Sequence, residues 1–264
     1  MAEWRKTVDF VGAYMKISLQ MALEYRVSFF SQLVGMFVND GIWLVFWYLY
    51  FSRFPVVKGW ERQDVLILWA VLTLGYGLFT GFFGNALRLS ELILQGQLDY
   101  YLVLPKDVLL HALLGRMYFT AWGDALFGLI VYFLFGQPDL ARTVIFLAVS
   151  VLTGLILVSF FVIAHSLALF LGGSQLISNQ LTVSMVHFAT YPGDIFQGAA
   201  KVILYTFIPA GFINTLPVSL MRQFSWHLFG ILTLVAFLLA LGAYRFFSVG
   251  LRRYESGNLV NLQG

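Results

Sequence analysis

Long apolar segments constrain this chain more than any other feature of its sequence. A helix that crosses the hydrocarbon core of a bilayer needs about 20 mainly apolar residues. Of the 264 residues, 60% are apolar and 11% are charged, whereas about 25% of the residues in a soluble domain are charged. The sequence therefore excludes an ordinary soluble protein and predicts an all-α, polytopic membrane protein. We expect six spans near residues 29–51, 65–83, 112–135, 143–171, 175–190 and 226–249.

Little of the chain is left outside these spans for a soluble catalytic domain. The longest connection, residues 84–111, is far too short to form one. The sequence has no GxxxxGK[ST] phosphate-binding loop and no cysteine, and its four histidines lack the spacing of metal ligands. We therefore expect no catalytic residue, no metal site and no cofactor in this chain, and no role in binding nucleic acid.

The segment of residues 4–26 differs from the spans because it carries many charges. Its apolar side chains recur at steps of three or four, which places them on one face of a helix. This pattern predicts an amphipathic helix that lies in the membrane interface. A first span with unusual flanks is the alternative. The polar face would carry Arg5, Asp9, Lys16, Gln20 and Glu24.

The distribution of lysine and arginine predicts the orientation, because these residues gather on the cytoplasmic side of membrane proteins. With both termini in the cytoplasm, ten of the 16 basic residues lie on that side. We therefore expect a multi-pass protein of the cell membrane whose termini are both cytoplasmic. The six basic residues on the outer side would be Arg53, Lys58, Arg62, Arg142, Lys201 and Arg222.

The cytoplasmic connection between the second and third spans has helical features. Residues 85–95 place leucines around Arg88 and Glu91, and Gly96 interrupts the pattern before a second apolar run that ends at Pro105. Glycine and proline are the residues that most often break a helix. The sequence therefore predicts a helix, a break and a second short element that presents polar side chains to a partner.

The outer connection before the last span, residues 191–220, also differs from a plain loop. It contains three of the six prolines, and its helical stretch Ile195–Ile208 is too short to cross a bilayer. Within a bilayer, an interrupted backbone is tolerated only against protein or water. We therefore expect a re-entrant helical hairpin that enters the outer leaflet.

A few polar and small residues fall inside the expected spans. Asn39, Asp40 and Asp124 lie mid-span, where an isolated charge costs about 2.5–3.5 kcal/mol. They either form hydrogen bonds between helices or line a path for a substrate. Gly77 and Gly81 form a GxxxG pattern that brings helices close, either in a dimer or within one chain.

Several short strings, taken together, resemble one family of membrane proteins. The strings are Gly96-Gln97-Leu98-Asp99-Tyr100-Tyr101-Leu102-Val103-Leu104-Pro105, Tyr191-Pro192, Ile195-Phe196, Gly198, Ile208-Pro209-Ala210, Pro217-Val218 and Gly250-Leu251-Arg252-Arg253-Tyr254-Glu255-Ser256-Gly257-Asn258. They resemble the permease subunits of ABC-2 type (type V, exporter-like) ABC transporters, in the ABC-2 family transporter group formerly classed as a domain of unknown function. The resemblance covers nearly the whole chain.

The resemblance implies a single transmembrane domain over residues 1–264. Residues 4–26 would be a connecting helix and residues 85–110 the coupling region that binds an ATPase. It further implies two permeases and two separate ATPase subunits per complex, with ATP and Mg bound by the ATPases. Coupling would involve Glu91, Gln95, Gly96, Asp99, Tyr100, Tyr101 and Pro105, and an outer gate in residues 191–220 would involve Tyr191, Pro192, Phe196, Pro209 and Phe212.

We therefore predict the permease subunit of an ATP-driven exporter, which is not itself an enzyme. The 27 Phe and 13 Tyr residues favour an amphipathic or hydrophobic substrate. The second permease is either a copy of this chain or a related one. A stand-alone secondary transporter or channel is the first alternative, although no internal repeat supports it. A membrane-embedded enzyme that acts on lipids is the second, and the sequence offers no acid–base cluster for it.

Overall fold

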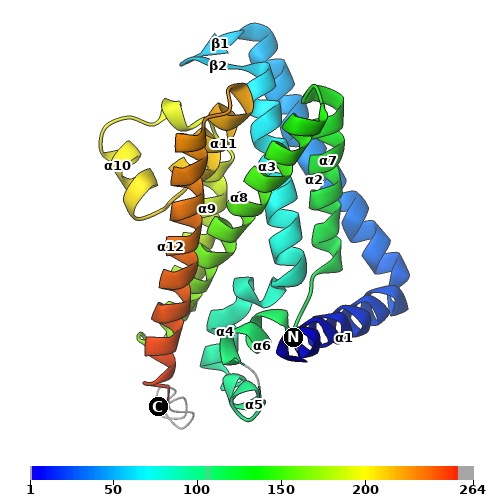
Figure 1. Cartoon of the computed structure of the whole chain (residues 1–264), viewed down its shortest axis with the longest axis vertical. Coiled ribbons are helices and arrows are strands. Elements are labelled where there is room, and N and C mark those ends of the chain that lie inside the picture. Colours follow the sequence, from blue (N-terminus) through cyan, green and yellow to red (C-terminus); the bar gives the residue numbers. More distant parts are fainter. Residues whose placement is uncertain (1, 106, 255–264) are drawn as a thin grey trace.

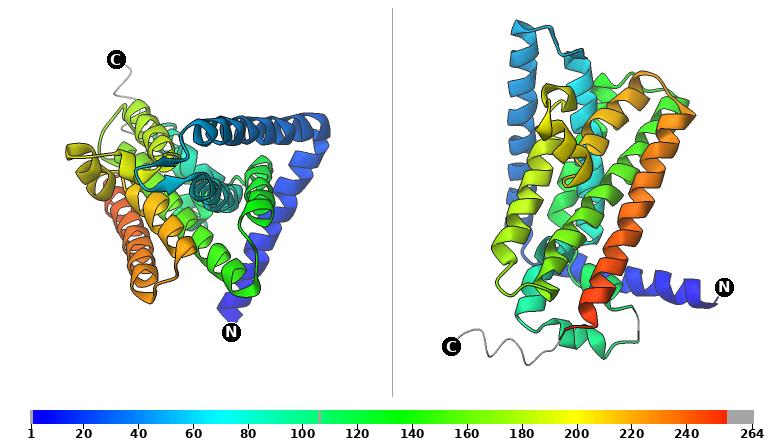
Figure 2. Two further views of the ribbon diagram at one scale, coloured as in Figure 1. Left: turned by 90° about the horizontal axis from the view of Figure 1, so that it is seen from above. Right: turned by 90° about the vertical axis from the view of Figure 1, so that its left-hand side faces the viewer.

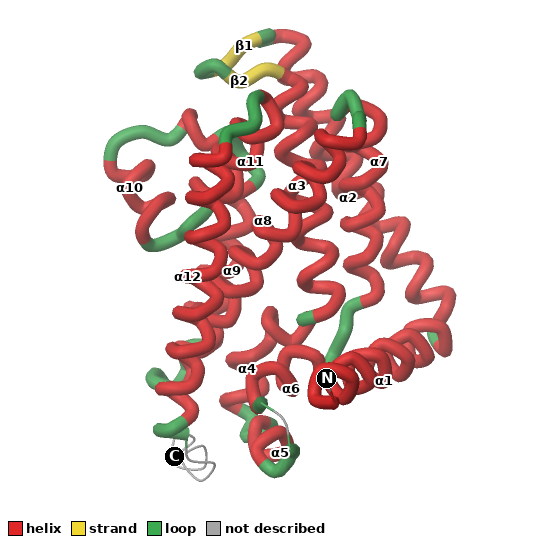
Figure 3. The backbone as a smooth tube through the Cα atoms, viewed as in Figure 1, coloured by secondary structure: helices red, strands yellow, loops and turns green. Residues whose placement is uncertain are grey.

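The structure, a computed structural model, is a bundle of long helices with one helix lying across its end (Figure 1). It describes residues 2–105 and 107–254, with side chains from residue 11 onward. About 81% of the chain is helical, which confirms the predicted all-α class. The single pair of strands in the described part is a two-residue hairpin, Val56–Val57 (β1) and Trp60–Glu61 (β2), as Figure 3 shows.

Four of the described helices are long and apolar enough to cross a membrane. They agree with the predicted first, second, fourth and sixth spans. Two of them, α3 and α8, are mostly buried inside the bundle, whereas the other two turn most of their apolar surface outward. Such outward apolar surface is what a lipid environment favours. The four helices are α2 (Arg26–Arg53), α3 (Arg62–Phe82), α8 (Leu140–Ser166, continued by η3, Leu167–Leu169) and α12 (Trp226–Leu251).

The third span is broken, so the prediction of one helix over residues 112–135 was wrong. The chain forms α6 (Val108–Leu114), then η2 (Phe119–Ala121) and α7 (Trp122–Phe135), with a bend of 72° between the two parts. Tertiary contacts create the break, because Tyr118 donates its backbone N–H to the carbonyl of Gly81 at 3.1 Å. Residue 118 is thereby held against the end of α3 instead of continuing the helix.

The segment after α8 forms three shorter helices. The helix α9 (Gln175–Ala189) corresponds to the predicted fifth span, but at 15 residues it is shorter than a full crossing. Beyond η4 (Gly193–Ile195), the outer connection forms α10 (Ala199–Thr206) and α11 (Gly211–Arg222), bent by 87°. A helical pair is therefore present, although its second helix extends beyond the predicted stretch and includes Pro217.

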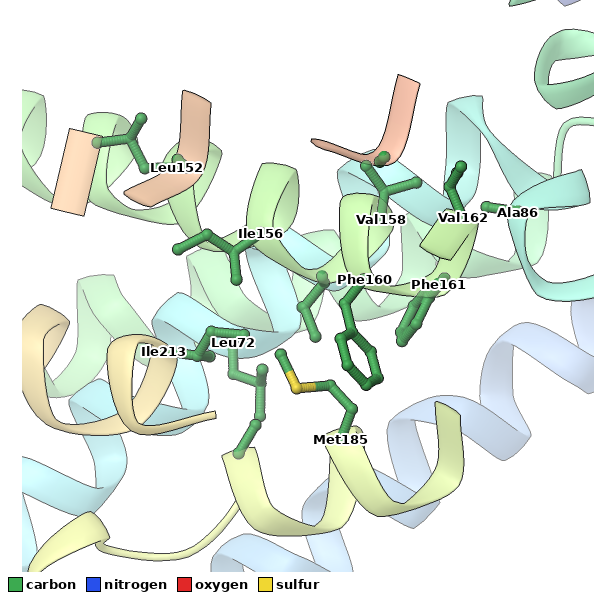
Figure 4. Close-up of a cluster of buried hydrophobic side chains, with 14 of the residues drawn as sticks. Leu72, Ala86, Leu152, Ile156, Val158, Phe160, Phe161, Val162, Met185 and Ile213 are labelled. Atoms are coloured by element: carbon green, nitrogen blue, oxygen red, sulfur yellow. The ribbon is translucent and has the colours of Figure 1, made fainter. Parts of the chain in front are cut away.

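The core of the bundle lies around α3 and α8, which cross at two glycines. A Cβ atom on Gly75 would come within 2.5 Å of the Ser150 carbonyl oxygen, and one on Gly154 equally close to that of Gly75. The two backbones are thus in direct contact. Side chains of α3, α8, α9 and α11 fill the neighbouring core, including Leu72, Ile156, Met185 and Ile213 (Figure 4).

Of the two alternatives for the GxxxG pattern of α3, a dimer contact or packing within one chain, the structure shows packing within the chain. Gly77 faces the backbone of Ala121 and Ala125, and Gly81 faces the indole of Trp122. Both contacts are made with the η2–α7 segment of the same molecule. Substituting a larger residue at Gly77 would therefore separate α3 from α7.

One end of the bundle, here called the α5 end, carries α1 (Ala2–Glu24) and a group of short helices. As Figure 2 shows, α1 lies across the bundle rather than along it. Between α3 and α6 the chain forms η1 (Gly84–Arg88), α4 (Leu89–Leu94) and α5 (Leu98–Leu102). Gly96 has φ +70°, so the predicted break falls at a conformation that favours glycine.

The opposite end, here called the β-hairpin end, carries β1–β2, the α7–α8 turn and α11 (Figure 1). The helix α3 begins there with a reciprocal cap, in which the Glu61 backbone N–H donates to the Asp64 carboxylate at 2.7 Å. Such a cap satisfies backbone donors that a helix start leaves unpaired.

Candidate functional sites

A cavity of about 370 Å³ lies between α2, α3, α7 and α9. It brings together the polar residues predicted within the spans, because Asn39, Asp40 and Asp124 all line it. Asp124 lies in the first turn of α7, and not mid-helix as the sequence suggested, because the third span is broken. We call this space the acidic cavity. Its remaining lining residues are Met36, Trp43, Trp69, Leu72, Thr73, Tyr76, Val186, His187 and Thr190.

The two carboxyl groups of the acidic cavity are buried, each residue being 7% exposed. Asn39 donates to Oδ1 of Asp40 at 3.4 Å, while Oδ2 of Asp40 is buried without a hydrogen-bond partner. The residues that line the cavity include no lysine and no arginine. A buried carboxylate without a counter-charge is strongly unfavourable. A proton or a bound cation would therefore stabilise these carboxyl groups by neutralising their charge.

Aromatic side chains also line the acidic cavity. The rings of Trp43 and Trp69 are stacked, with centroids 5.8 Å apart and planes 24° apart. Tyr191, a predicted gate residue, packs edge-on against Trp43 and Trp47. Aromatic faces attract cations, by about 0.5–2 kcal/mol each. Carboxylates and tryptophans in one cavity thus favour the same ligand, a cation with apolar surface.

The residues predicted to couple the chain to a partner gather at the α5 end. Arg88 binds Glu91 through two hydrogen bonds of 2.6 and 2.7 Å, and this pairing lowers the pKa of Glu91. Gln95 donates to the same carboxylate at 3.3 Å. The charged face of α4 is thus internally paired, and its apolar face lies against α8 and α9.

The second short helix, α5, carries Asp99 and Tyr100 on the surface of the protein. Both are exposed, Tyr100 by 64%. Tyr101 differs from the prediction of a presented side chain, because it is half-buried, with its ring 6.4 Å from that of His111. Pro105 is exposed just after the helix, as a stop signal would be.

Two other segments contact this region and support its position. Tyr14 of α1 packs edge-on against His111, with centroids 6.2 Å apart. Burial and the nearby Asp99 carboxylate raise the pKa of Tyr254, just beyond α12, to about 12. The helix α1 and the end of α12 therefore both lie against the α5–α6 segment.

The β-hairpin end holds a group of paired charges that the sequence did not reveal. Arg222 of α11 binds Asp64 of α3 through hydrogen bonds of 2.6 and 2.5 Å, and it also donates to the Gly59 carbonyl at 2.7 Å. Asp194 accepts from the Trp60 indole at 3.0 Å and lies 3.5 Å from Lys201. These contacts join the β-hairpin to the helical pair α10–α11. No sequence signal links partners that are more than 130 positions apart.

The other predicted gate residues lie within the outer helical pair and its approach. Phe196 packs edge-on against Phe188 of α9, and Phe212 packs against Tyr205 of α10. Pro192 and Pro209 are buried at the turns that precede η4 and α11. Of the five predicted gate residues, Tyr191 is thus the one that contacts the tryptophans of the acidic cavity.

A comparison with protein families identifies the kind of protein to which this chain is similar. Residues 37–257 match a family model described as ABC-2 family transporter protein. No curated protein and no solved structure matches the chain. In the described residues there is also no group of three or more potential metal ligands.

Proposed function

Because the chain belongs to the ABC-2 family of transporter proteins, we propose that it forms, with a second permease, the path of an ATP-driven exporter. As a member of this family it is a membrane component of an ABC transporter and works with ABC ATPase subunits. The complex would contain two permeases and two ATPases, with ATP and Mg bound by the ATPases. Both termini would lie in the cytoplasm, where the α5 end would meet the ATPases.

The acidic cavity is the observation that carries this proposal, since it is a space in which a substrate could reside. Its two carboxylates would attract a positive charge, and the stacked rings of Trp43 and Trp69 would contact apolar groups. The expected amphipathic substrate would therefore carry a positive charge. The free-energy cost of burying the substrate's charge would be offset by ion pairing with the carboxylates and by contact with the aromatic faces.

The cavity also lies where two permeases could enclose it. Between Val34 and Leu49, the exposed side chains of α2 beside the cavity are apolar apart from Asn39, and they include Val38 and Ile42. We propose that the partner permease covers the α2 side of the cavity. Tyr191 would close its outer end, and the helical pair α10–α11 would form a re-entrant hairpin above it.

The experiment that tests the proposal is co-purification of the full-length chain from its native membrane. We expect an ABC ATPase at one copy per permease. The double variant Asp99→Ala/Tyr100→Ala should lose it, because these side chains are exposed on α5. Lys58→Ala, an exposed change at the β-hairpin end, should keep it. Tyr101 is left unchanged because its packing against α6 would confuse binding with folding.

The same preparation separates the proposal from its alternative. A second permease in the sample, a copy or a relative, would support the paired path. If no ATPase is recovered in several mild detergents, and the chain alone moves tetraphenylphosphonium across liposomes, the chain is a stand-alone transporter and the proposal is wrong.

A further inference from the structure

Three buried polar side chains form a hydrogen-bonded chain through the core between the α5 end and the acidic cavity. Ser90 of α4 contacts Nδ1 of His165 at 2.8 Å, and Nε2 of His165 contacts the Thr182 hydroxyl of α9 at 3.1 Å. Ser90 and His165 are each 1% exposed, and Thr182 is 8% exposed. We call these three residues the His165 relay.

Both ring nitrogens of His165 form hydrogen bonds, so the orientation of the imidazole relative to α4 and α9 is fixed. A neutral imidazole has one donor and one acceptor nitrogen, so each hydroxyl has a defined role for a given tautomer. Moving α4 relative to α9 would break one of the two bonds. That would leave a buried polar atom unpaired, which is costly in an apolar core. The relay therefore resists relative movement of the two helices.

Three buried hydroxyls of α8 itself take no part in the relay. The hydroxyls of Ser150, Thr153 and Ser166 are buried and have no hydrogen-bond partner in the described residues. By contrast, Ser178 of α9 donates to the Ala164 carbonyl at 2.8 Å, beside the relay. The helices α8 and α9 are thus joined twice, and Ser90 adds α4 to them.

The two ends of the relay lead to different sites. On α4, Ser90 is followed at once by Glu91, whose carboxylate lies on the charged face of the same helix. On α9, Thr182 lies one turn before Val186, which lines the acidic cavity with His187 and Thr190. The relay thus runs from the predicted ATPase-binding helices to within one helical turn of the cavity wall.

We propose that His165 is the positioning residue through which a displacement of α4 is passed to α9 and changes the acidic cavity. This inference rests on the proposed function, in which a bound ATPase displaces the α4–α5 segment. Two hydrogen bonds hold α4 and α9 in one register, because displacing either helix would leave a buried polar atom unpaired. His165 touches no substrate and acts through Thr182.

The test uses the absence of cysteine from the chain. A single Thr190→Cys substitution places a thiol in the cavity wall of the full complex with its ATPase. The rate of maleimide labelling of this thiol is measured with and without AMP-PNP and Mg. We expect the nucleotide to change the labelling rate at least fivefold. Adding Thr182→Val or Ser90→Ala should reduce this to less than twofold.

Two matched variants distinguish transmission from simple loss of structure. Thr182→Ser retains the hydroxyl and should restore the nucleotide effect. Thr153→Val makes the same change as Thr182→Val at a buried hydroxyl without a partner, and should leave the effect intact. If Thr182→Val prevents folding, Ser90→Ala provides the same test from the α4 side with a smaller change.

Failure of the relay and failure of the proposed function give different results. If the ATPase co-purifies and AMP-PNP changes labelling equally in Thr182→Val, Ser90→Ala and Thr153→Val, the relay is wrong. It is also wrong if AMP-PNP changes nothing in the single-cysteine complex. If no ATPase is recovered with any variant, the proposed function fails, and the relay fails with it.

Discussion

Carboxylates at the β-hairpin end and in the acidic cavity have opposite surroundings. Asp64 meets the guanidinium of Arg222 through two hydrogen bonds. Asp40 and Asp124 line a cavity to which neither lysine nor arginine contributes. The same side chain therefore joins two connections in one region and lacks a counter-charge in the other. The difference lies in the partners that the fold supplies.

The largest expected effect concerns the unpaired carboxylates. The double change Asp40→Asn/Asp124→Asn should weaken binding of tetraphenylphosphonium about 100-fold, or about 2.8 kcal/mol. Equilibrium dialysis of the purified complex measures this. Asp139→Asn, on the α7–α8 turn, is the control and should change little, because asparagine also caps a helix well. Equal binding of uncharged triphenylphosphine oxide would contradict the role of charge.

The second effect concerns the paired carboxylate. Arg222→Met should lower the free energy of unfolding by about 2 kcal/mol, because it leaves Asp64 nearly buried and without its cation. The estimate is below that for a fully buried pair because Arg222 is 45% exposed. Thermal unfolding followed by tryptophan fluorescence measures the change. A melting temperature equal to that of the wild type would show that the pair does not join α3 to α11.

A smaller effect is expected at the α5 end, where Glu91 is paired with Arg88. Because this pairing lowers the pKa of Glu91 in the folded state, its stabilisation is complete above the ordinary value of about 4.3. It is lost as the pH falls from there through the lowered folded pKa. The free energy of unfolding should therefore fall by about 1 kcal/mol at most between pH 7 and pH 3. Melting temperatures measured over this range should show the decrease. Arg88→Met should reduce it, and an unchanged acid profile in that variant would contradict the assignment.

The smallest effect is expected for the exposed pair of Lys201 and Asp194. Their charged atoms lie 3.5 Å apart, with side chains 51% and 39% exposed. Lys201→Met should therefore change the free energy of unfolding by a few tenths of a kcal/mol. The same thermal assay compares it directly with Arg222→Met. Equal losses for the two variants would mean that burial does not distinguish the pairs.

The fold was predicted best where apolar length alone decides it. The helices α2, α3, α8 and α12 cover the predicted spans, and Gly96 breaks the connection after α3 as expected. The break between α6 and α7 was missed because neither glycine nor proline alone causes it. Tyr118 is held by the Gly81 carbonyl of α3, and a contact between distant residues leaves no local pattern.

The candidate sites show the same division. Asp40 and Asp124 were recognisable because acidic residues are rare in apolar segments. Their meeting in one cavity, with Trp43 and Trp69, was not predictable because it depends on how four helices pack. His165 is one of the four histidines that lack the spacing of metal ligands, and it is buried in the core. Its bonds to Ser90 and Thr182 come from packing alone.

The sequence by itself determined that this chain is a helical membrane protein with internal carboxyl groups and a helical connection after its second span. It did so because hydrophobic length and residue chemistry are local properties. Only the tertiary structure decided which carboxyl groups meet a cation of the same chain and which line a cavity without one. Asp64 lies 158 positions from Arg222, and two such side chains meet only when the helices between them have packed.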